Sequence, residues 1–183
     1  MLNASLTWSR SEGLNMIAHG DYWDPSLIWY AGDFGKDPND LTNAKGLLQN
    51  DRTWVLKVQA GYTFPWDILA SLNYYYQTGI PLPIYIRLDG LNQDPHGLGR
   101  RILAESRNDD NRTDGWSRLD VRLQKTFNLH KSLRFKAILD VFNVFNTSTI
   151  VHHASYDTWA ENYLEPDWIF FPRRFQIGAR LEF

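Results

Sequence analysis

The chain has 183 residues, 43% of them hydrophobic, and a formal net charge of −2. No apolar run approaches the ~18 residues of a membrane-spanning helix, and a near-neutral charge gives no reason to expect nucleic-acid binding. Because the sequence contains no cysteine, it has neither a disulfide framework nor a thiolate metal site. The mean hydropathy of −0.43 still leaves open a protein that crosses a membrane with strands, because such strands average to mild hydrophilicity.

Six stretches alternate apolar and polar residues with a period of two, which predicts strands with two unlike faces. In chain order they cover residues 2–9, 53–64, 68–77, 118–127, 133–141 and 175–183. Residues 65–67 and 128–132 are predicted to be short turns. The connections 10–51, 79–116 and 143–172 are long and rich in Gly, Pro, Asn and Asp.

Loops of this length are improbable inside a compact soluble domain. Short turns at one end and long loops at the other are typical of outer-membrane barrels. The sequence therefore predicts an all-β fold, a section of an antiparallel transmembrane β-barrel. It would contain about six strands, with short periplasmic turns and long extracellular loops.

The final strand ends the chain on an aromatic residue, which is unusual for a soluble protein because termini are normally polar and frayed. Its spacing resembles the assembly signal of outer-membrane barrels: a polar residue, a Gly two positions later, then apolar residues three and five after the Gly. The residues that fit this pattern are Gln176, Gly178, Leu181 and Phe183. We therefore expect the barrel-assembly machinery to be a partner. The alternative is an edge strand of a soluble sheet.

Aromatic residues gather near both ends of the predicted strands, as expected of rings at the two membrane interfaces. Those near the long loops are Trp8, Trp54, Tyr74, Tyr76, Trp116 and Phe175, and those near the short turns are Tyr62, Phe64, Trp66, Phe127, Phe135 and Phe183. Lys125 breaks the apolar pattern of its strand. It lies two residues from Phe127, near the predicted periplasmic interface, where snorkelling lowers the cost of a charge.

Four segments resemble parts of TonB-dependent outer-membrane receptors. Residues 118–127 resemble the family's RLDLRLEKRF strand, residues 139–146 its DVFNLFN stretch, residues 74–81 its YxSGxP stretch, and residues 175–183 its closing strand. The resemblance covers roughly two thirds of the chain. It implies a barrel of about 22 strands, plugged by an N-terminal domain, that imports a scarce ligand with energy relayed by TonB.

The chain departs from that pattern because residues 1–183 contain no plug, no TonB-contacting box and only about six predicted strands. The resemblance therefore implies the carboxy-terminal part of such a barrel in a bacterial outer membrane, in contact with the lipid bilayer. TonB would be contacted only through a missing N-terminal part. The first residues carry no export signal, which leads us to expect a piece of a longer chain.

No catalytic constellation stands out, so we expect neither an enzyme nor a bound cofactor. A metal cluster of His152, His153, Asp157 and Glu161 is disfavoured because these residues fall in a long polar loop without supporting spacing. A calcium loop starting at Asp110 is disfavoured because Arg112 stands where a ligand is needed.

Side chains suited to contact a ligand occur in the loops and on one face of the predicted strands. The candidate ligand-contacting aromatics are Trp23, Trp29, Trp159 and Trp168, suited to siderophores, carbohydrates or peptides; alternatively they pack on each other. The predicted lumen-facing charges are Arg118, Asp120, Arg122, Arg134, Lys136, Asp140, Arg180 and Glu182. They would line a translocation path or form interstrand ion pairs.

Two other functional classes remain open at this point. One is a small self-contained outer-membrane barrel or adhesin, although six strands fall below the about eight of the smallest barrels. The other is a soluble carbohydrate-binding β-sandwich, favoured if the aromatic residues form one core.

Overall fold

The computed structural model describes residues 1–14, 42–48, 50–88, 100–130 and 133–183. Six long strands form the main sheet: β1 (Leu2–Trp8), β4 (Trp54–Phe64), β5 (Ile68–Gln77), β8 (Trp116–His130), β9 (Leu133–Phe142) and β12 (Arg174–Glu182). Three short pairs lie outside it: β2 (Glu12–Leu14) with β3 (Lys45–Leu47), β6 (Tyr85–Leu88) with β7 (Arg100–Leu103), and β10 (Ile150–His153) with β11 (Pro166–Ile169).

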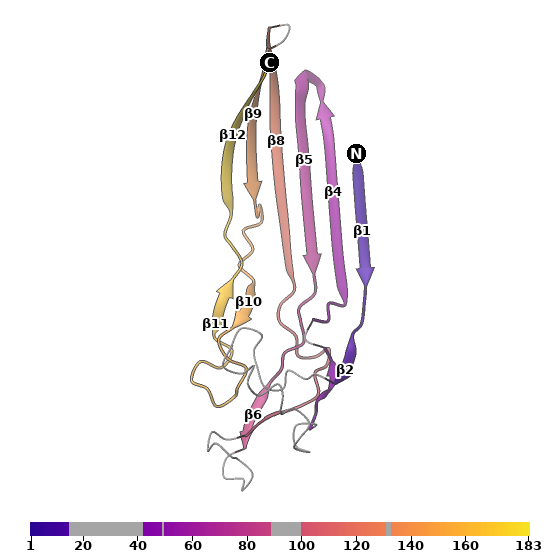
Figure 1. The fold of residues 1–183 in the computed structure, drawn as a ribbon, viewed down its shortest axis with the longest axis vertical. Coiled ribbons are helices and arrows are strands. Elements are labelled where there is room, and N and C mark those ends of the chain that lie inside the picture. Colours follow the sequence, from indigo (N-terminus) through magenta and orange to yellow (C-terminus); the bar gives the residue numbers. More distant parts are fainter. Residues whose placement is uncertain (15–41, 49, 89–99, 131–132) are drawn as a thin grey trace.

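The main sheet has the strand order β1-β4-β5-β8-β9-β12, and every neighbouring pair is antiparallel. The prediction of an all-β, antiparallel fold is confirmed. The described strands form an open sheet rather than a closed barrel, with β1 and β12 at its two edges (Figure 1). We call the end with the tight turns the turn end and the end with the short strand pairs the loop end.

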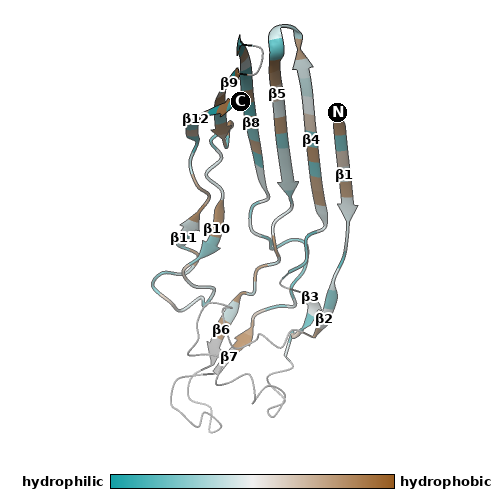
Figure 2. Cartoon of the chain, turned by 45° about the horizontal axis from the view of Figure 1, so that its top comes forward, coloured by the Kyte–Doolittle hydropathy of each residue, from teal (hydrophilic) through white to brown (hydrophobic). Residues whose placement is uncertain are grey.

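The register keeps most apolar residues of the six strands on one face, which we call the apolar face, although Leu69 and Ile138 lie on the other face. In the middle of the sheet, Leu72 stands opposite Ala60 and Val121. Toward the carboxy-terminal edge, Leu139 stands opposite Leu123 and Ile177. The intervening residues form the polar face. The predicted alternation is therefore confirmed, and hydropathy changes in bands along the strands (Figure 2).

The structure confirms the first predicted turn and corrects the start of the second. Residues Pro65–Asp67 form a single 3-10 turn, with Trp66 and Asp67 in the left-handed region at φ 63° and 57°. The second turn is predicted to begin too early, because β8 continues to His130, which pairs with Leu133 after a register shift between Asn128 and His130. The period-two pattern continues through Asn128, whose side chain donates to Asp67 (3.2 Å) rather than making a turn.

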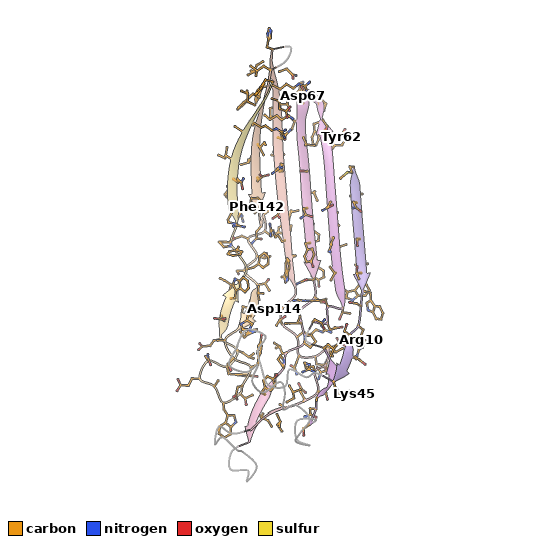
Figure 3. All side chains as sticks on the ribbon, viewed as in Figure 1. Arg10, Lys45, Tyr62, Asp67, Asp114 and Phe142 are labelled. Carbon is orange, nitrogen blue, oxygen red and sulfur yellow. The ribbon has the colours of Figure 1, made fainter. Side chains whose placement is uncertain are left out.

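The loops also contain order that the sequence did not predict. The short strands β2, β3, β6, β7, β10 and β11 have three or four residues each, too few for a readable alternation. Beyond the loop end of the sheet, Tyr85, Leu103 and Tyr156 form a small buried cluster. Figure 3 places Tyr62 and Asp67 toward the turn end, and Arg10 and Lys45 among the loop segments.

The main sheet buries little in the described structure. Asp140 is the one buried residue among the described positions of its six strands. Apolar side chains are widely accessible, with Leu6 at 65%, Tyr62 at 62% and Ile177 at 86% exposure. In the described part of the chain, no helix is long and apolar enough to cross a membrane.

Candidate functional site

The polar face of the main sheet collects the predicted lumen-facing charges. All eight lie on this face, together with Lys57 and Arg174. The cations on it are Lys57, Arg118, Arg122, Arg134, Lys136, Arg174 and Arg180, and the acids are Asp120, Asp140 and Glu182. The described polar face is therefore cationic, whereas the whole chain has a net charge of −2.

Ion pairs hold most of these charges. Arg122 donates from Nε and Nη2 to the two carboxylate oxygens of Asp140, at 2.6 and 2.9 Å, linking β8 to β9. Lys136 donates to Glu182 (2.7 Å), linking β9 to β12. Charge-assisted, two-point contacts of the Arg122 kind are stronger and more directional than single ones. These two pairs match the alternative prediction of interstrand ion pairs.

The other predicted charges pair within one strand or stand apart. Arg118 donates to Asp120 two residues along β8 (2.8 Å), and Arg180 lies 3.2 Å from Glu182 in β12. Arg134 has no ion pair with any described residue, although it stands opposite Glu182 in the register. The side chain of Arg180 is 68% exposed.

Asp120 also fixes the loop end of the sheet through Asn143. Asp120 accepts the backbone N–H of Asn143 (3.0 Å), which adopts φ 53°. Asn tolerates this left-handed conformation better than most residues. The Asn143 amide donates to the carbonyls of Thr147 (3.0 Å) and Phe171 (2.9 Å). This residue therefore ties both ends of the third long connection to β8 and β9.

A stack of aromatic rings attaches the same connection to the polar face. Trp116 stacks on Tyr75 with ring centroids 4.8 Å apart and packs on Phe170 at 4.7 Å. The ammonium of Lys57 lies 5.7 Å from the centre of the Tyr75 ring. Because these ring faces contact each other, the stack holds the loop segment in place.

A second network, which we call the outer clamp, consists of Arg10, Asp51, Asp109 and Arg112. The side chain of Asp51 is fully covered and accepts the backbone N–H of Ser11 (2.6 Å) and Arg112 Nη2 (2.5 Å). Arg112 also donates to Asp109 (2.7 Å), which accepts Arg10 (2.9 Å). Hydrogen bonds from Arg112 and Arg10 hold the pKa of Asp109 below its usual value. The clamp joins the first long connection to the second.

Gly79 lets two backbone segments meet beside the clamp. A Cβ at this position would lie 1.6 Å from the Thr113 carbonyl oxygen, so no other residue fits without moving the backbone. The Ile80 N–H donates to Thr113 Oγ1 (3.0 Å), and Arg112 donates to the Gly79 carbonyl (2.9 Å). The glycine of the receptor-like stretch therefore has a steric role here.

The predicted ligand-contacting aromatics are accessible where they are described. Trp159 is 64% exposed and Trp168 is 50% exposed. Trp168 stands opposite His152 in the β10–β11 pair, and the Trp159 N–H donates to Asp157 (3.0 Å). Trp23 and Trp29 lie outside the described residues. Ligand contact by these four side chains stays a prediction.

The residues weighed as a metal cluster have separate surroundings. His152 Nδ1 lies 3.2 Å from Asp167, whereas His153 is buried and meets the Tyr156 ring edge-on at 5.8 Å. Within the described segments, no group of three or more His, Asp and Glu side chains is placed to hold a metal ion. Burial, with a smaller effect of His152, lowers the pKa of His153, and Asp114 opposes the shift.

His153 gives the loop end a predicted pH dependence. Because its pKa is lowered on folding, the unfolded chain binds more protons than the folded chain at mildly acidic pH. Its contribution to stability is complete above the ordinary pKa of about 6.5 and is lost as the pH falls below that value. We expect proteolysis of the β10–β11 region to rise between pH 7.5 and 5.5, and His153→Gln to remove this difference. The exposed His130→Gln is the control, and an equal effect of both variants would contradict the assignment.

The residues that organise this region differ in how clearly a sequence pattern marks them. Asn143 lies in a recognisable receptor-like stretch, and Asn is a known signal for left-handed turns. Asp51 has no such signal, because its partner Arg112 is 61 residues away. The only pattern around Arg112 is a calcium-loop spacing, which this residue interrupts.

Three residues of the predicted assembly signal lie in the edge strand β12, and Phe183 follows its last residue. Gln176, Gly178 and Leu181 stand opposite Asp140, Ile138 and Phe135, and Phe183 is 98% exposed. A Cβ at Gly178 would lie 3.7 Å from Ile138, an ordinary contact distance, so local packing does not demand glycine there.

No protein-family model, curated protein or solved structure matches the chain. The likeness to TonB-dependent receptors therefore depends on the sequence stretches alone, and what it implies for function is a proposal.

Proposed function

We propose that the chain is a section of barrel wall in a bacterial outer membrane, the carboxy-terminal section of a TonB-dependent receptor that imports a scarce ligand. The observation that carries this proposal is the apolar face of the main sheet, which is continuous over six strands and accessible. The proposal assigns no catalytic role, and the ligand class remains siderophore, carbohydrate or peptide.

The exposure of the apolar face favours lipid as its surroundings. Leu6, Ile177 and Leu181 are 65%, 86% and 55% exposed, and they come from both edge strands. Monomeric soluble proteins rarely expose large contiguous apolar patches, because each buried Å² is worth about 25 cal/mol. Acyl chains would cover this face without a second protein layer.

Four of the six main-sheet strands have the length of a bilayer span, whereas β1 has 7 residues and β8 has 15. The strands β4, β5, β9 and β12 contain 11, 10, 10 and 9 residues, and a tilted membrane strand needs about 9–11. Lys125, the charge on the apolar face, directs its ammonium to the Trp66 carbonyl at the turn end and lies 5.5 Å from the centre of the Phe127 ring. A lysine near a membrane interface is expected to snorkel in this way, so the contact supports the proposal.

The other two classes have less support. A β-sandwich needs a second layer over the apolar face, but the described short strand pairs lie beyond the loop end of the sheet (Figure 1). A self-contained barrel needs about eight strands or more, and the main sheet has six with two open edges. Open edges favour pairing with further strands.

The test compares one charge on each face of the same strand. Val121 lies on the apolar face between Leu72 and Val141, and Gln124 lies on the polar face between Leu69 and Ile138. We expect Val121→Arg to abolish insertion into lipid vesicles, because an arginine at the bilayer midplane costs about 2–4 kcal/mol. Gln124→Arg should insert like the unchanged chain. Insertion is measured by protection from protease after refolding into vesicles.

Gln124 is chosen for the polar-face variant because its side chain has no described ion pair. The neighbouring polar-face residue Arg122 is unsuitable, because its removal would leave the Asp140 carboxylate without its partner. Equal insertion of the two arginine variants would refute the membrane assignment of the apolar face. A chain that stays folded and monomeric in buffer without detergent would do the same.

A further inference from the structure

We propose that the polar face of the main sheet is a path for anions, which recognises ligands that carry carboxylate or phosphate groups. This inference rests on the proposed function, in which the polar face borders the lumen, and it narrows the ligand class. Its basis is the sign, spacing and pairing of the charges on that face.

The sign of the face is opposite to that of the chain. The polar face carries four more cations than acids, whereas the whole chain has a net charge of −2. The remaining residues are therefore acidic overall, so the positive charge is concentrated on the polar face. Rings or rows of Arg and Lys select anions in membrane pores, and clefts of one sign focus the field on a ligand of the opposite sign.

The cations extend along the whole length of the strands. Near the loop end, Lys57 and Arg118 stand on either side of Tyr75 in one row across the sheet. Arg122 lies in a row nearer the turn end, and Lys136 faces Arg180 in a row nearer still. Successive polar-face positions on a strand are roughly 6.6 Å apart. Between the row of Arg122 and the row of Lys136 there is therefore only one row without a cation. An anion that leaves one cation would cross at most that one row before it meets the next.

Three of these cations form no ion pair with a described acid. Asp120, Asp140 and Glu182 are all engaged in ion pairs with other residues. Lys57, Arg134 and Arg174 have no carboxylate within ion-pair distance in the segments that the structure describes. Lys57 and Arg174 lie in the half of the sheet nearer the loop end, and Arg134 lies near the turn end, so cations without an ion pair to a described acid are present at both ends of the path.

The arrangement favours a passing anion over a fixed docking partner. A path must bind at several sites, each weakly enough to release the ligand. The paired Arg122 remains 50% exposed and the Arg180 side chain 68% exposed, so each is open to a second acceptor. Guanidinium groups match carboxylate and phosphate oxygens in a two-point geometry.

The experiment measures binding of tripolyphosphate and citrate to the full chain refolded in nonionic detergent, by isothermal titration calorimetry. We expect both anions to bind, and to bind more weakly as the salt concentration rises. Spermine, a polycation used for comparison, should bind at least tenfold more weakly. The triple variant Lys57→Gln, Arg134→Gln, Arg174→Gln should lose at least tenfold in anion affinity. These three residues carry no described ion pair, so the interstrand pairs remain.

The matched control neutralises three cations elsewhere: Lys125→Gln on the apolar face, and Lys45→Gln and Arg173→Gln at the loop end. It should leave anion affinity within twofold. Because Arg174 also contacts Phe142 and Phe171, the single variant Arg134→Gln is measured in parallel and should lose two- to threefold. The inference is overturned if the two triple variants lose equal anion affinity, or if Arg134→Gln loses none. It is also overturned if polyglutamate binds and the two small anions do not, because an acidic protein surface would then be the occupant.

Failure of this inference and failure of the proposed function are distinguishable. If Val121→Arg and Gln124→Arg insert equally, the membrane assignment fails whatever the anion titration shows. If only Gln124→Arg inserts and neither anion binds, the barrel section stands and the anion path is wrong.

Discussion

Replacing Asp51 by alanine is expected to destabilise the chain by roughly 3–5 kcal/mol, the usual range for removing one partner of a buried ion pair. The Asp51 carboxylate is fully covered and accepts both Ser11 N–H and Arg112. Without it, Ser11 N–H loses its acceptor and Arg112 keeps only Asp109 and two carbonyls. We expect earlier unfolding in urea and faster proteolysis of the segments around Ser11 and Arg112.

Glu12→Ala provides the control for that variant. Glu12 pairs with Arg10 in the same region, but both side chains are about half exposed, and such pairs are worth at most about 1 kcal/mol. Comparable destabilisation by the two variants would show that the outer clamp is a surface charge network rather than a buried anchor.

Gly79→Ala is expected to separate the two segments that meet beside the clamp. Its Cβ would lie 1.6 Å from Thr113 O and 2.5 Å from Thr113 C, both backbone atoms that no side-chain rotation can move away. Overpacking typically costs about 1–3 kcal/mol, and the fixed backbone atoms put this variant at the upper end of that range. The Arg112 bond to the Gly79 carbonyl should be lost with the contact. Urea unfolding and proteolysis of residues 79–83 report the effect.

Gly61→Ala is the matched control, because its added Cβ would have 3.8 Å to its nearest neighbour, Ser71 Cβ. It lies on the polar face of β4 with an ordinary strand backbone, where alanine removes only conformational freedom of the unfolded chain. Unchanged or slightly raised stability is expected. If Gly79→Ala behaves like Gly61→Ala, the close approach of residues 79 and 113 is absent in solution.

These two sites depend on contacts that no local pattern predicts. Gly79 belongs to a receptor-like stretch, but its steric partner Thr113 lies 34 positions further along the chain, and nothing local predicts that approach. Arg112 and Asp51 fall in two different predicted loops, each without a periodic pattern. A long-range contact of this kind leaves no period in the sequence, because each partner is constrained only by the other.

The six long strands, their order along the chain and their two faces follow from the sequence alone. A period of two fixes which side chains share a face, and any slip of one residue would turn Leu72 or Val121 to the wrong side. The tight turn at residues 65–67 also follows from the local sequence. Pro65 ends the preceding strand, and only residues 65–67 remain to reverse the chain before the next strand begins.

Tertiary structure decided the rest. It paired Arg122 with Asp140 and Lys136 with Glu182, left Lys57, Arg134 and Arg174 without described acidic partners, and built three short strand pairs inside the predicted loops. The physical reason is the range of the forces involved. The alternation of apolar and polar residues is a local pattern along one strand, so it can be read directly from the sequence. Charge pairing and close backbone packing depend instead on which distant residues the folded sheet brings within a few ångströms of each other.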